Sequence, residues 1–99
     1  MYDLLKKSNK MDNREKLLKM DRALMLMEDL KNSQIAIVEK ASQLQVDAMQ
    51  FNFSEMEKNI GELFTRYNES LDMVNAEAER FELKRDEFEK KHGLNIVEE

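Results

Sequence analysis

A large apolar side chain recurs at every seventh position through the second half of the chain, at Phe53, Ile60, Tyr67, Val74, Phe81 and Phe88. A seven-residue apolar repeat is typical of an α-helix whose narrow seam packs along another helix. Because the repeat runs without interruption, it predicts one continuous helix. This helix must therefore lie against another helix.

Composition supports an all-α fold class. The 99 residues include no Pro and only two Gly, and 37% of them are charged, which is the profile of long helices. A chain of this length forms one small domain at most and buries only a modest part of its surface by itself. The absence of Cys excludes disulfides and thiolate metal sites.

A second stripe precedes the first, at Ala23, Leu30, Ile37, Leu44 and Phe51, accompanied four residues later by Met27, Gln34, Ala41 and Ala48. The two stripes are out of phase, because a seven-residue step beyond Phe51 reaches Lys58 and not an apolar residue. The chain is therefore expected to change direction near residues 51–54.

Capping signals set the bounds of the two helices. Asp12 and Glu15, and likewise Ser54 and Glu57, have the three-residue spacing of a capping box, in which the side chain of the first residue accepts a hydrogen bond from the N–H of the second. Lys90, Lys91 and His92 precede Gly93, as at many helix C-termini. We predict a helical hairpin over 12–92, with a helix over about 13–51, a turn over about 51–54 and a helix over about 55–92. Residues 1–11 would form a basic arm or short helix, and residues 93–99 a tail.

The nearly equal predicted lengths favour an antiparallel two-helix coiled-coil hairpin. A turn near residue 52 pairs Ala41 with Phe64 and Leu17 with Phe88. The alternative is one unbroken helix in a parallel dimer, since the turn contains neither Gly nor Pro. In the hairpin, the core would consist of Leu30, Ile37, Ala41, Leu44, Ile60, Phe64, Tyr67, Leu71, Val74, Ala78 and Phe81.

The first helix has more apolar residues than one seam can cover. A helix that is apolar over a wide arc needs a partner on a second side. We therefore expect dimerisation into a four-helix bundle or docking into a larger assembly. Methionine suits either an adaptable interface or an ordinary bundle core, and the chain has eight. The predicted protein interface comprises Leu17, Leu18, Met20, Leu24, Met25, Leu26, Ile35 and Val38.

Two smaller features interrupt the helical pattern. Gln34 lies within the first apolar stripe, where a polar residue either fixes the register of the helices or marks a solvated edge of the seam. Gly61 lies early in the second helix and would permit a close approach near Leu44.

Charge and hydropathy argue against other classes of partner. Residues 1–22 carry seven basic and four acidic groups, but Tyr2 is their only aromatic residue, so nucleic acid binding is not expected. The longest unbroken apolar run is 23–27, too short for a signal peptide or a membrane span. We therefore expect a cytosolic protein without membrane contact.

Catalytic motifs are nearly absent from the sequence. The chain has a single His and no Gly-rich phosphate loop. Glu89 and His92 have the spacing found in half of a carboxylate di-iron site, but Lys90 and Lys91 lie beside them and would repel a cation. We therefore expect no metal, no cofactor and no enzymatic activity.

Two functional hypotheses follow. The first is a non-enzymatic structural or assembly subunit of a multi-protein complex, which acts through its apolar Leu and Met face. The second is a small soluble regulator, an inhibitor or chaperone, that binds one target protein through the same face.

Overall fold

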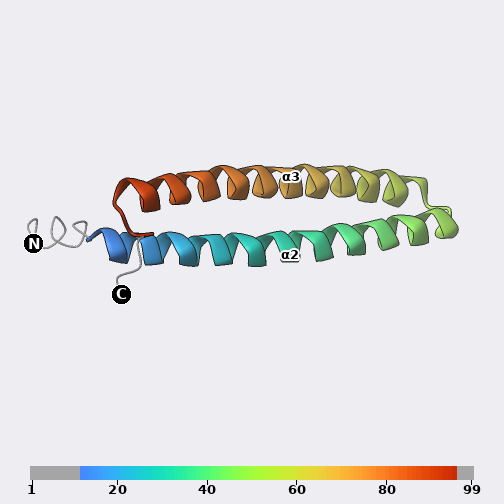
Figure 1. Cartoon of the computed structure of the whole chain (residues 1–99). Coiled ribbons are helices and arrows are strands. Elements are labelled where there is room, and N and C mark those ends of the chain that lie inside the picture. The colour runs from blue at the N-terminus through green and yellow to red at the C-terminus, as the bar shows by residue number, and fades with distance from the viewer. Residues whose placement is uncertain (1–11, 96–99) are drawn as a thin grey trace, which may run out of the picture.

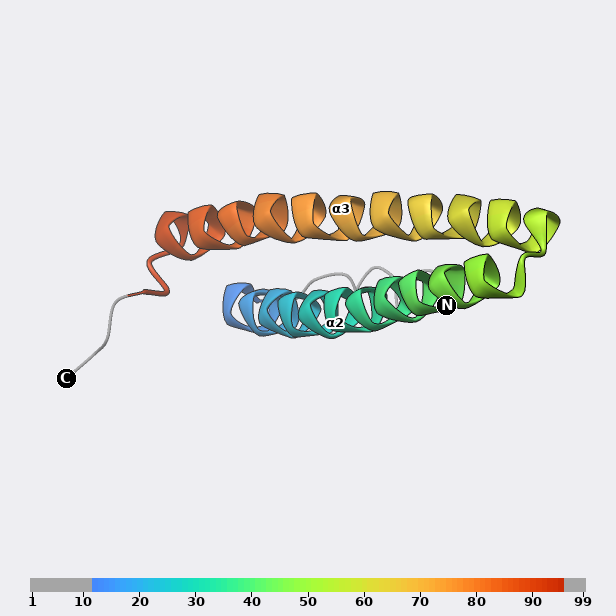
Figure 2. The same ribbon diagram turned by 90° about the vertical axis from the view of Figure 1, so that its right-hand side faces the viewer.

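The computed structural model describes residues 12–95, which form two long antiparallel helices, α2 (Asn13–Phe51) and α3 (Ser54–Lys91). The helices lie side by side from the turn to the open end, and they remain neighbours when the view is turned (Figures 1 and 2). The predicted all-α helical hairpin is confirmed, and the alternative of one unbroken helix is wrong. The predicted arm at 1–11 and residues 96–99 of the tail lie outside the described residues.

The turn takes only two residues, Asn52 and Phe53. Asn52 adopts the left-handed conformation with φ 63° and ψ 33°, and its N–H donates to the carbonyls of Ala48 and Met49. Asn is one of the few residues besides Gly that reaches this region at low cost. The chain therefore reverses without Gly or Pro.

The capping box predicted at Ser54 is not formed. Phe53 is the N-cap of α3, no side chain caps this end, and Ser54 is already the first helical residue. Because α3 starts one residue before the predicted position, the Glu57 N–H donates to the Phe53 carbonyl at 3.0 Å. This backbone bond replaces the side-chain bond that the sequence suggested.

The other two predicted helix ends are capped as their residues indicate. The Asp12 carboxylate accepts a hydrogen bond from the Glu15 N–H at 2.8 Å. After His92, Gly93 has φ 64°, its N–H donates to the Lys90 carbonyl, and the Leu94 N–H donates to the Glu89 carbonyl. These paired bonds define a Schellman motif, which ends α3.

Contacts across the hairpin fix its register. Lys16 lies over the ring of Phe88, with 5.1 Å from Nζ to the ring centroid, and Arg85 bonds to Asp21. Near the turn, Gln45 lies beside Gly61. These pairs lie within one residue of the predicted register.

The seam of α2 is displaced from the predicted stripe. Leu30, Ile37 and Leu44 were expected in the core, but they are exposed, with Leu44 at 40%. The side of α2 that packs against α3 is marked by lower exposure at Leu17, Met20, Leu24, Met27, Lys31, Gln34, Ile35, Val38, Ala41, Gln45 and Ala48.

The displacement has a simple physical reason. The predicted stripe and the observed seam share Met27, Gln34, Ala41 and Ala48. Periodicity alone therefore does not determine which second row of residues completes the seam. The observed seam includes the charged residue Lys31, which interrupts its apolar pattern in the sequence. The Lys31 ammonium escapes the seam and pairs with Glu28 at 3.9 Å, as a long lysine side chain permits.

The predicted core residues of α3 do face α2. All of them are half-buried, namely Ile60, Phe64, Tyr67, Leu71, Val74, Ala78 and Phe81. On α2, the predicted core residue Ala41 is buried. The strict seven-residue repeat of α3 is thus the internal seam of the hairpin.

Candidate protein interface

The hairpin buries little of its apolar surface. Among residues 12–95, Ala41 and Ala48 are the buried hydrophobic residues, and no large side chain is fully buried. Two packed helices shield each side chain from one direction only, so the large seam residues remain half-exposed. Further protein surface is needed to bury them completely.

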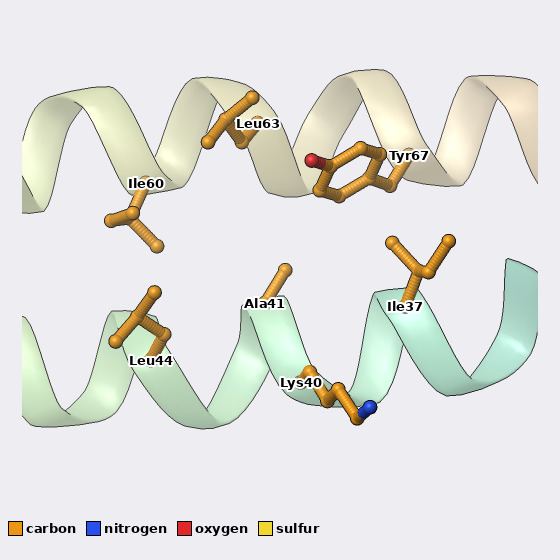
Figure 3. A pocket seen from close by; sticks show the side chains of 7 residues that line it. All are labelled: Ile37, Lys40, Ala41, Leu44, Ile60, Leu63 and Tyr67. Atoms are coloured by element: carbon orange, nitrogen blue, oxygen red, sulfur yellow. The ribbon is translucent and has the colours of Figure 1, made fainter.

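A groove opens along one flank of the seam in the half nearest the turn (Figure 3). Its volume is about 210 Å³, and it is lined by Ile37, Lys40, Ala41, Leu44, Ile60, Leu63 and Tyr67. Ile37, Ala41 and Leu44 extend from α2 toward α3, while Ile60 and Tyr67 extend from α3 toward α2. Lys40 is the charged residue of this lining and lies along its own helix.

The apolar surface continues from the groove to the turn. Phe53, Met56 and Ile60 line a second hollow, and Ile60 also lines the groove. Phe53 is exposed, and its ring centroid lies 6.4 Å from that of Phe51. We call this combined surface, formed by the linings of the groove and the hollow, the groove face.

A separate apolar patch lies on the outer side of α2, nearer the open end. It contains Leu18, Met25 and Leu26, each more than half exposed, with Leu26 at 67%. Arg22 and Asp29 join Met25 and Leu26 around a shallow hollow there. These charges interrupt the apolar surface, so this patch is less continuous than the groove face.

The structure divides the predicted interface into two groups. Leu18, Met25 and Leu26 are exposed and available to a partner. The other five are half-buried and belong to the seam side of α2, where α3 already contacts them: Leu17, Met20, Leu24, Ile35 and Val38. Conversely, the exposed Leu30, Ile37 and Leu44 were predicted for the core.

Charged groups gather at the open end around Arg85, whose side chain is only 20% exposed. Its guanidinium donates to Asp21 of α2 at 2.7 Å and to Asp86 and Glu89 of α3 at 3.1 Å. Hydrogen bonding to Asp21 and Asp86 raises the pKa of Arg85 above its usual value, although desolvation opposes the shift. This network joins the two helices, and its three carboxylates surround one cation.

The candidate metal ligands Glu89 and His92 have other partners. Glu89 binds the Arg85 guanidinium through both carboxylate oxygens. His92 Nδ1 lies 3.0 Å from the Asn13 amide nitrogen, and its ring packs against Phe88 with 4.5 Å between centroids. Within residues 12–95, no three His, Cys, Asp or Glu side chains are grouped so that they could hold a metal ion.

Polar side chains also occupy the seam itself. The Gln34 Oε1 atom is buried and has no hydrogen-bond partner among the described residues. A Cβ atom placed on Gly61 would lie 3.0 Å from Gln45 Nε2, so the close approach predicted for Gly61 involves Gln45 and not Leu44. These residues shape the hairpin but offer no reactive chemistry.

Three apolar residues of the groove face were not among the predicted interface residues, namely Phe53, Met56 and Leu63. Met56 and Leu63 are seven residues apart, on the flank of the α3 repeat. That spacing is a signal, but two residues are too few to stand out as a stripe. Leu63 becomes informative only when the fold places it in the same groove as Leu44.

Comparisons with known proteins add no relative. No protein-family model matches the chain, and no similar curated protein or solved structure was found. Within residues 12–95, neither helix is long and apolar enough to cross a membrane.

Proposed function

We propose that this chain is a non-enzymatic helical interaction protein, a structural or assembly subunit whose groove face is covered by helices of another protein molecule. The observation that carries the proposal is the continuous apolar surface formed by Ile37, Leu44, Ile60 and Leu63 and extended by Phe53. Large apolar groups in such a patch favour burial by roughly 1.5 to 3 kcal/mol each.

The geometry of the groove suits a helical partner. It lies between the two antiparallel helices, and side chains of both helices form its walls. A third helix laid along such a groove contacts both neighbours, which is how helix bundles fill their cores. The half-buried residues beneath the groove, such as Tyr67, would then be shielded from a second direction.

The alternative is a small regulator that binds a single target through the same surface. Self-association and single-target binding predict different behaviour of the purified chain. Size-exclusion chromatography with light scattering should show a stable oligomer for a self-assembling subunit. A labile monomer that folds fully only with a target would favour the regulator.

Dye binding and chemical unfolding test the premise that the subunit and the regulator share, namely a groove face that needs a protein partner. If the groove face needs a partner, the monomeric chain should bind an environment-sensitive apolar dye and should unfold at low urea concentration. Substitution of Leu44 by Lys should reduce dye binding, and Leu26→Lys serves as the matched control outside the groove. A stable monomer that binds no dye would contradict both the subunit and the regulator.

A further inference from the structure

We propose that the partner of the groove face is a second copy of this chain, packed antiparallel across a two-fold axis that passes near Leu44 and Leu63. The inference rests on the proposed function and names the occupant of the groove. It is carried by two rows of side chains, one on each helix, that bracket the groove with self-complementary polar groups.

The row on α2 consists of Lys40, Leu44 and Asp47. Residues spaced by four and three positions lie along one side of a helix, so a positive and a negative group flank Leu44. Neither Lys40 nor Asp47 forms an ion pair with another residue of 12–95; Asp47 accepts only an amide hydrogen bond from Gln43 at 3.2 Å. A two-fold axis beside Leu44 would bring Lys40 of each copy to Asp47 of the other.

The row on α3 repeats the same spacing with Asn59, Leu63 and Arg66. Leu63 is exposed at its centre and lines the groove. Arg66 is held by Glu62 at 2.9 Å, which orients the guanidinium on the outer surface. Across a two-fold axis beside Leu63, Asn59 of each copy could accept a hydrogen bond from Arg66 of the other.

One axis can serve both rows, because the rows lie at the same level of the hairpin. The register that places Gln45 beside Gly61 also places the midpoint of Lys40 and Asp47 opposite the midpoint of Asn59 and Arg66. A single perpendicular axis therefore relates α2 to its copy and α3 to its copy. An interface of this kind is isologous, as in most homodimers.

The resulting assembly is a four-helix bundle over the turn halves of two hairpins. Each helix would have antiparallel neighbours on both sides, since α2 and α3 are already antiparallel. The open end of the hairpin is a poorer site for a second copy, because Asp21, Asp86 and Glu89 gather there around one cation. Like charges across an interface oppose association.

Cysteine cross-linking tests the axis directly, since the chain has no native Cys. In the full chain, Leu44→Cys should form a disulfide-linked dimer under mild oxidation, because residues beside a two-fold axis meet their own copies. Leu26→Cys, on the outer side of α2 and more exposed than Leu44, is the control and should cross-link far less. Equal cross-linking at both positions would overturn the proposal.

A charge reversal tests the polar contacts. Lys40→Asp and Asp47→Lys should each weaken the dimer on the order of tenfold, since each change removes two symmetric ion pairs and introduces repulsion. The double variant should recover most of the loss. If the double variant is no tighter than either single variant, the two residues do not meet and the proposed axis is wrong.

Light scattering separates failure of this inference from failure of the proposed function. A dimer of twice 11.8 kDa that Leu44→Lys dissociates and Leu26→Lys leaves intact supports both proposals. A labile monomer that binds the dye overturns the proposal of a second copy but agrees with a groove that binds another protein. A dimer lost through Leu26→Lys overturns the groove face as its interface. A stable monomer without dye binding overturns both.

Discussion

The two halves of the hairpin are held together by different chemistry. In the half nearest the turn, Ala41, Ala48 and Gly61 are small, and the polar seam residue beside Gly61 is Gln45. At the open end, the cross-helix contacts include the bond of Asp21 to Arg85 and the stacking of Lys16 over Phe88. The turn half relies on close approach, whereas the open end relies on charged groups.

This difference explains where the free apolar surface lies. Small residues let the helix backbones come together, but they cannot cover the large side chains on the flank, so Leu44 and Leu63 remain exposed. At the open end, charged groups find partners within the chain. Large apolar side chains are also exposed nearer the open end, at Leu18, Met25 and Leu26, but charged residues interrupt them there. The continuous apolar surface lies in the turn half, and the interaction site is proposed there.

The largest expected effect is on Phe64, a large aromatic residue of the seam in the turn half. Phe64→Ala should lower the free energy of unfolding by about 3 kcal/mol, the lower end of the range for buried Phe, because Phe64 is half-buried. Phe88→Ala should cost clearly less, because the last turns at the open end can separate without unfolding the rest. Urea unfolding followed by circular dichroism measures both.

These unfolding measurements require one fixed protein concentration, since self-association would add to stability. Equal losses for the two variants would show that the open end is as well fixed as the turn half. In that case the contrast between the two halves would not hold.

A smaller effect is expected from the ion pair that joins the helices at the open end. Asp21→Asn removes the carboxylate that accepts from Arg85 across the hairpin and should lower the free energy of unfolding by about 1 kcal/mol. Glu77→Gln is a control, because Glu77 pairs with Arg80 on the same exposed helix face and should leave stability nearly unchanged. Thermal unfolding at low and high salt compares them, and only the Asp21 effect should shrink noticeably with salt.

If the two variants behaved alike, the Arg85 network would add no more stability than a local surface pair. The open end would then be held chiefly by the aromatic contact of Phe88 with Lys16.

Much of the fold could be read from local signals. The phase change between stripes predicted the reversal, and Asp12 and Gly93 predicted their helix ends because caps depend on a few neighbouring residues. The start of α3 was harder to predict from the sequence. Phe53 serves as its N-cap only because the left-handed Asn52 closes the turn one residue early.

The side of α2 that meets α3 could not be chosen from its own pattern. The stripe with Leu30, Ile37 and Leu44 is more uniformly apolar than the true seam, which contains Lys31 and Gln45. A polar residue can occupy a seam when its end reaches solvent or a small partner, as Lys31 and Gln45 do here. Those compensations depend on both helices, so the groove face became visible only with the fold.

The smallest expected effect concerns Gly61, which permits the close approach of the turn half. Gly61→Ala gains about 1 kcal/mol in helix propensity, but the new Cβ would lie 3.0 Å from the Gln45 amide, which must move aside. Because that amide ends a flexible side chain, we expect a net stabilisation of about 0.5 kcal/mol. In a Gln45→Ala background the same change should gain more, since the obstacle is absent. A loss of stability in both backgrounds, measured by urea unfolding, would mean that the backbones and not the Gln45 side chain limit the approach, and that the turn half is more tightly packed than its contacts indicate.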